Sequence, residues 1–89
     1  MSDAATKIRE LIKINSFEQA YKVGFAALSA QPNDKLTLKT MYDLSAKLRS
    51  ECMDLAIKKM DSGEPYLSTE ALLRKVNKLT GEDMHGNLI

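Results

Sequence analysis

KLTLKTMYDLSAKLRSECMDLAIKKMDS, residues 35–62, decides the fold, because it contains neither glycine nor proline. Pro32, Asn33 and Asp34 come just before it, and this combination predicts the end of one helix and the cap of the next. An uninterrupted stretch of this kind predicts a single helix over about residues 34–61. At 1.5 Å per residue it would be about 40 Å long, more than twice the length of an average helix.

The rest of the chain has apolar residues at helical spacing, which predicts three shorter helices at about residues 3–14, 17–30 and 69–80. Several residues are expected to start or end the helices: a capping box of Ser16 and Gln19 at the second helix, Ser68 as the cap of the last helix, Gly63 as the left-handed end of the long helix and Gly81 as the end of the last one. Gly24 lies on the apolar face of the second helix, where it predicts close approach of a neighbouring helix.

These patterns together predict an all-α fold, a small four-helix domain with one long central helix and three shorter helices. The domain is expected to cover residues 1–81. Residues 82–89 show no periodicity and are predicted to form a flexible tail.

Composition restricts the function classes. The 13 basic and 12 acidic residues give a net charge of +1, so no strong attraction to nucleic acid or anionic lipid is expected. The apolar runs are too short to span a membrane, and the first residues lack the pattern of a signal peptide. Cys52 is the only cysteine, which fits a reducing compartment. We therefore expect a cytoplasmic protein of bacterial or phage type, with no membrane association.

The long helix carries more apolar surface than one face can hold. One stripe follows alternating steps of four and three residues: Met41, Ser45, Leu48, Cys52 and Leu55, widened by Leu44. A second group, Met53, Ala56, Ile57 and Met60, points in other directions. A helix that is apolar around most of its circumference must be covered on more than one side. Either the chain's own short helices cover it, or a second copy or a partner protein does.

The length of the helix favours association, because 40 Å exceeds the diameter of about 26–30 Å expected for a compact chain of this size. The candidate interaction surface is Cys52, Met53, Leu55, Ala56, Ile57 and Met60. Methionine side chains suit an adaptable contact surface.

No catalytic motif is apparent in the sequence. His85 is the only histidine, no nucleophile motif surrounds a serine or threonine, and Cys52 fits a structural thiol. Glu51 and Asp54 resemble half of the magnesium site of all-helical nucleotide pyrophosphatases, but the second acidic pair is missing. We predict a protein that is not an enzyme, with no metal, no cofactor and no small-molecule substrate.

The last predicted helix carries a basic patch formed by Arg74, Lys75 and Lys78 together with Asn77. Such a patch could contact the phosphates of a nucleic acid, so a nucleic-acid partner is possible but not favoured. A solvated helix face is the simpler interpretation of these residues.

The element order also resembles a family of small nucleoid-associated modulators. The similarity lies in Ile14-Asn15-Ser16-Phe17-Glu18 between two short helices and in Met41-Tyr42 on the long helix, within about residues 7–65. The chain departs from that family at residues 43–47, where acidic and histidine positions are replaced. The resemblance implies a regulator that acts through a DNA-binding partner protein.

The leading hypothesis is a non-enzymatic protein-interaction module or small adaptor that self-associates, as a homodimer, through the long third helix. The alternative is a small regulator acting at nucleic acid, either directly through the basic helix or through a DNA-binding partner.

Overall fold

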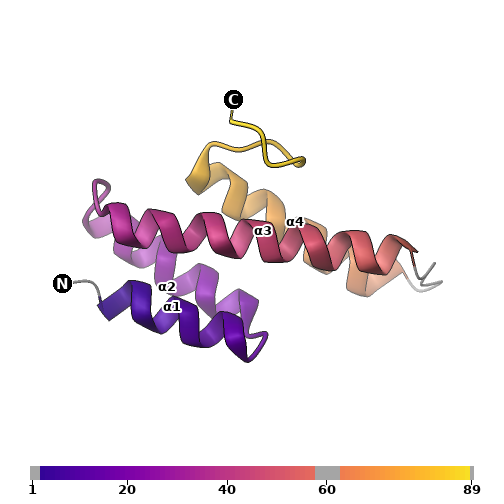
Figure 1. Cartoon of the computed structure of the whole chain (residues 1–89), viewed down its shortest axis with the longest axis horizontal. Helices are drawn as coiled ribbons and strands as arrows, with labels where there is room; N and C mark the ends of the chain where they lie inside the picture. The colour runs from indigo at the N-terminus through magenta and orange to yellow at the C-terminus, as the bar shows by residue number, and fades with distance from the viewer. Residues whose placement is uncertain (1–2, 58–62, 89) are drawn as a thin grey trace. The chain divides into compact units, whose positions relative to one another are not determined.

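Four helices make up the computed structural model, which describes residues 3–57 and 63–88 (Figure 1). They are α1 (Asp3–Lys13), α2 (Phe17–Ala30), α3 (Lys35–Ile57) and α4 (Gly63–Thr80). The described residues form no strand, only an isolated antiparallel bridge between Glu82 and Leu88. The predicted all-α class with four helices, the third of them longest, is confirmed. The end of the predicted long helix, residues 58–61, lies outside the described residues. Among the helices that the structure describes, none is long and apolar enough to cross a membrane.

Backbone contacts divide the chain into two compact units, residues 1–44 and residues 45–89, and α3 contributes to both. The first unit contains α1, α2 and the start of α3. The second contains the rest of α3, α4 and the residues that follow it. The prediction of a single domain over residues 1–81 stays a prediction.

The link between α1 and α2 closes the end of α1 with backbone hydrogen bonds, and the predicted capping box at the start of α2 does not form. Asn15 adopts a left-handed conformation with φ of 60°, its N–H bonds to the carbonyl of Ile12, and the N–H of Ser16 bonds to the carbonyl of Leu11. These two bonds satisfy carbonyls at the end of α1, and asparagine tolerates the left-handed conformation. The capping-box prediction was wrong, because the Ser16 side chain makes no capping hydrogen bond at α2.

Gly24 is buried within α2, and the predicted close approach is confirmed. The neighbour is the side chain of Met41 on α3, which is also buried. A Cβ atom added at Gly24 would lie 2.9 Å from Cε of Met41 and nearer still to its Sδ. Glycine therefore makes room for Met41, which explains a residue that is unfavourable in a helix interior.

Asp34 caps α3 as predicted. Its Oδ1 accepts a hydrogen bond from the N–H of Thr37 at 3.3 Å, and its Oδ2 accepts one from the Thr37 hydroxyl at 2.7 Å. A carboxylate at this position also suits the positive end of the helix dipole.

The start of α4 differs from the prediction. Gly63 begins this helix instead of ending the previous one, and Ser68 lies within it rather than capping it. Pro65 is compatible with this start because the first N–H groups of a helix have no partner inside the helix. The predicted end is confirmed, since Gly81 has a φ of 79° and its N–H bonds to the carbonyl of Asn77 at 2.8 Å.

Candidate functional site: a groove between α3 and α4

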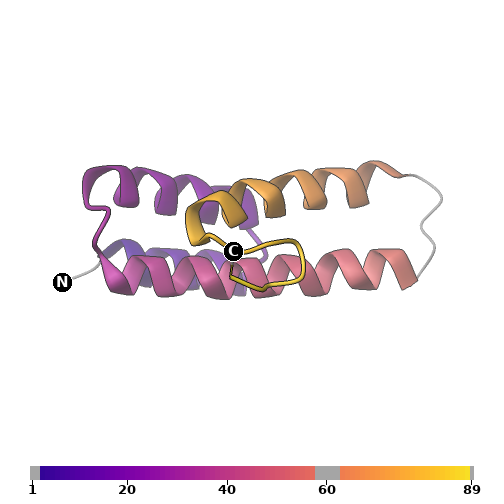
Figure 2. The ribbon, with the colours of Figure 1, turned by 90° about the horizontal axis from the view of Figure 1, so that it is seen from above.

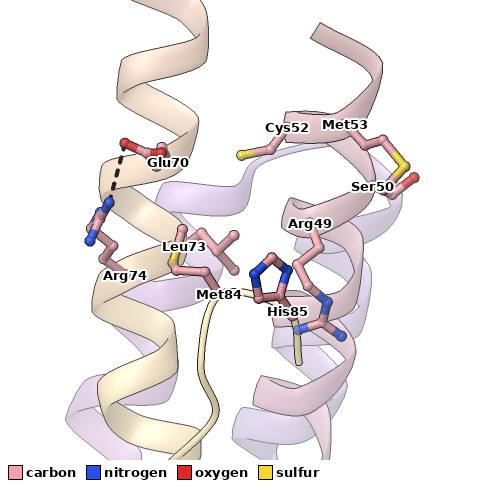
Figure 3. Close-up of a pocket in the computed structure, with 9 residues that line it drawn as sticks. All are labelled: Arg49, Ser50, Cys52, Met53, Glu70, Leu73, Arg74, Met84 and His85. Carbon is pink, nitrogen blue, oxygen red and sulfur yellow. Dashed lines mark ion pairs between the residues drawn. The ribbon is translucent and has the colours of Figure 1, made fainter. Parts of the chain in front are cut away.

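An open groove of about 720 Å³ lies within the second unit (Figure 3). Its lining comes from three segments: Arg49, Ser50, Cys52 and Met53 of α3, Glu70, Leu73 and Arg74 of α4, and Met84 and His85 of the residues after α4. Apolar and sulfur-containing side chains therefore share the groove with charged ones.

The groove brings together residues that the sequence assigned to two different surfaces. Cys52 and Met53 belong to the predicted interaction surface, and Arg74 belongs to the predicted basic patch. In Figure 3 the sulfur of Cys52 points toward α4, whereas Met53 points away from it. The side chain of Met53 is 65% exposed.

The structure describes only part of the remaining residues of the predicted interaction surface. Leu55 is half-buried on α3 and does not line the groove. Ala56 and Ile57 lie on α3, but their side chains are outside the described part of the structure, and Met60 is outside it altogether.

The predicted basic patch is divided. Arg74, Lys75 and Lys78 are all exposed on α4. Arg74 forms an ion pair with Glu70 at 3.6 Å, which offsets its charge. Lys78 and Arg74 line a second, adjoining pocket, whereas Lys75 lines neither.

Asn77 is a buried polar centre that the sequence analysis missed. It was grouped with the basic patch, but it is only 6% exposed. Its Oδ1 accepts a hydrogen bond from the Ser45 hydroxyl at 2.9 Å, and its Nδ2 donates to the carbonyl of Asp83 at 3.1 Å. The signal was present, because Asn77 is four residues after the buried Leu73 and so shares its helix face.

Arg49 extends this network. Its Nη1 donates to the hydroxyl of Ser45 at 2.9 Å and lies 3.6 Å from Oε2 of Glu82. Glu82 is only 8% exposed, and its other carboxylate oxygen, Oε1, has no hydrogen-bond partner among the described residues. A buried carboxylate that is only partly paired destabilises the arrangement that holds it.

Residues 81–88, which we name the 81–88 turn, fold back after α4 (Figure 2). Asp83 organises the turn: its Oδ1 accepts hydrogen bonds from the N–H groups of His85 and Asn87 at 2.8 and 2.9 Å. Gly86 has a φ of 87° and lies directly against the guanidinium of Arg49. The sequence of this segment predicts no regular structure. The predicted flexibility of residues 82–89 stays a prediction.

Cys52 is poorly suited to act as a nucleophile. Burial raises the pKa of its thiol, and the nearby carboxylates of Glu70 and Glu51 raise it further. Since the thiolate is the reactive form, these surroundings keep Cys52 as a weakly reactive thiol at neutral pH. Within residues 3–57 and 63–88, no cluster of three or more His, Cys, Asp or Glu side chains could hold a metal ion.

Acid is expected to loosen the 81–88 turn. Hydrogen bonds from the backbone N–H of Asn87, and next from that of His85, lower the pKa of Asp83 below its ordinary value. A group with a lowered folded-state pKa contributes stability above its unfolded pKa of about 3.9, and this contribution is lost as the pH falls through the folded value. In an NMR titration, the amide protons of His85 and Asn87 should shift together, with an apparent pKa lower than that of an aspartate in an unfolded chain. Independent titration of the two amides, or a midpoint above that of an unfolded aspartate, would contradict this prediction.

No family model, curated protein or solved structure gives a significant match to this chain.

Proposed function

We propose that this chain is a non-enzymatic protein-interaction module that self-associates through the second half of α3. The observation that carries the proposal is the exposed thioether of Met53 at the edge of the groove. Met53 lines the groove together with Cys52, Leu73 and Met84, and its side chain points away from α4 at the outer edge (Figure 3). Exposed apolar surface of this kind commonly marks a contact with another protein.

The side chains of the groove support this role on chemical grounds. Met53 and Met84 have flexible, polarisable thioethers that adapt to the shape of a partner, and grooves rich in methionine accept amphipathic helices. The charged residues Arg49, Glu70 and Arg74 stand beside them, as expected for a polar rim around an apolar contact.

The Glu70–Arg74 ion pair makes the alternative, direct binding to nucleic acid, less favourable. A phosphate group would compete with Glu70 for the guanidinium of Arg74.

Analytical ultracentrifugation over a range of concentrations tests the proposal. Wild-type protein is expected to sediment as a dimer at micromolar concentration. Met53→Asp should weaken the dimer by about ten- to a hundredfold, because removing a buried side chain from a contact costs about 1.5–3 kcal/mol.

The matched control is Ala71→Asp, which adds the same charge at an exposed position of α4 outside the groove. It should leave the dimer unchanged. A wild-type protein that stays monomeric at high concentration, or equal effects of the two substitutions, would contradict self-association through this surface.

A further inference from the structure

One face of α3 carries an exposed stripe with the spacing of a contact between two helices. Ala46, Ser50 and Met53 are exposed and follow one another at steps of four and three residues, so they share one side of the helix. In Figure 3 the side chains of Ser50 and Met53 lie on the side of α3 away from α4. The two small residues let another helix come close to the backbone, and Met53 supplies an adaptable apolar contact. The stripe therefore fits one further helix.

Two opposite charges flank this stripe along the same edge. Lys47 and Asp54 are exposed and seven residues apart, so they lie close to two turns, or about 10 Å, from each other along the helix axis. Within residues 3–57 and 63–88, neither of them forms an ion pair. Both charges are therefore available to a partner.

An antiparallel copy of α3 complements both charges. When Met53 packs against Ser50 of a second copy, the two-fold axis between the helices makes the same contact twice. In that register Lys47 lies beside Asp54 of the second copy, because flanking positions on the same edge face each other across an antiparallel pair. The symmetry repeats this ion pair as well. The edge of the stripe is thus complementary in charge to itself.

The same charges disfavour other arrangements of two α3 helices. Sliding one helix by seven residues puts Lys47 against Lys47 of the second copy in one direction, and Asp54 against Asp54 in the other. A parallel pair would instead offer Arg49 to Asp54 of the second copy. Arg49 is already bonded to Ser45 and paired with Glu82, so this exchange would leave the buried carboxylate of Glu82 without its cation. Repulsion and unpaired buried charge thus select the antiparallel register.

We propose that the occupant of the stripe is α3 of a second copy, in antiparallel orientation, with Ser50 against Met53 and Lys47 against Asp54 across the two-fold axis. The inference rests on the proposed self-association and adds the orientation and register of the pair. Because exposed ion pairs are screened by salt, the dimer should weaken as the ionic strength rises.

Charge reversal tests the register by sedimentation of the full chain. Lys47→Glu and Asp54→Lys should each weaken the dimer by about five- to thirtyfold, because each turns two attractive contacts into two repulsive ones. An equimolar mixture of the two variants should associate about as tightly as wild type, since one chain then carries two negative charges on this edge and the other two positive charges. Both positions are exposed, so circular dichroism should show that each variant folds.

The matched control is Lys75→Glu, which reverses a charge at an exposed position of α4 outside both pockets. It should leave the dimer unchanged. A mixture of the two α3 variants that associates no more tightly than either alone would show that the charges act within one chain, and it would overturn the proposed pairing. Weakening by Asp54→Lys but not by Lys47→Glu would indicate the parallel arrangement and overturn it too.

The outcomes also separate this pairing from the proposed function. A wild-type dimer that Met53→Asp weakens, and that neither charge reversal changes, keeps self-association and overturns the antiparallel register. Wild-type protein that stays monomeric at high concentration overturns both. Loss of the dimer in each single reversal and its return in the mixture support both.

Discussion

Leu48→Asp is expected to unfold the chain at neutral pH. The side chain of Leu48 is 1% exposed, so the substitution removes a buried apolar group and places a carboxylate where water cannot reach it. Loss of a buried leucine side chain alone costs about 2–5 kcal/mol. Burial of an unpaired charge adds several more. The total approaches the whole stability of a chain of this size, about 4–13 kcal/mol at the usual value per residue. Circular dichroism at 222 nm should show loss of most of the helix signal.

Met53→Asp is the matched control, because it introduces the same residue into the same helix five positions later, at an exposed site. It should fold with a helix signal close to that of wild type. A folded Leu48→Asp variant with wild-type urea resistance would show that Leu48 does not belong to the core of the chain.

Asn77→Ala is expected to destabilise the chain by about 2–4 kcal/mol, more than an average substitution at a polar position. It removes the acceptor of the Ser45 hydroxyl and the donor to the carbonyl of Asp83. Ser45 is fully buried, so its hydroxyl proton then has no protein acceptor at that position. Urea unfolding followed by circular dichroism measures the loss.

A double-mutant cycle with Ser45→Ala isolates the contact between the two side chains. We expect a coupling energy of at least about 0.5 kcal/mol, because the residues share one hydrogen bond and a common neighbour in Arg49. Strictly additive effects would show that Ser45 and Asn77 act independently. Lys75→Ala, at an exposed site of α4 that was assigned to the same basic patch as Asn77, should change stability by less than about 0.5 kcal/mol.

Local sequence signals were sufficient to predict most of the helices. The absence of glycine and proline after residue 34 predicted α3, Asp34 its cap, and Gly81 the end of α4, because each depends on the conformation of a few neighbouring residues. The same reasoning failed at Gly63 and Pro65, where it predicted a helix end and a loop, whereas α4 begins at Gly63. Proline is compatible with the first turn of a helix, so its presence alone does not separate a loop from a helix start.

Periodicity also identified much of the buried stripe on α3. Met41, Ser45 and Leu48 are all buried as their spacing predicts. It placed Ser45 among apolar residues without a role, whereas the structure shows a hydroxyl that bonds to Asn77 and Arg49. Arg49 is four residues from Ser45 on the same helix, so helix geometry predicts that the two are neighbours. Asn77 is 32 residues away, and its contact with Ser45 cannot be inferred from helix geometry.

The sequence alone therefore determined most of the helices, the cap of α3, the end of α4 and much of the buried stripe on α3, because these depend on residues within one or two turns of each other. Only the tertiary structure decided that Cys52, Met53 and Arg74 line one groove, and that Met84 and His85 complete it. Residues far apart in sequence meet there through the pairing of Arg49 with Glu82 and of Ser45 with Asn77. Such contacts depend on how helices pack and on where the backbone turns at Gly81 and Gly86, and no local pattern of residues specifies them.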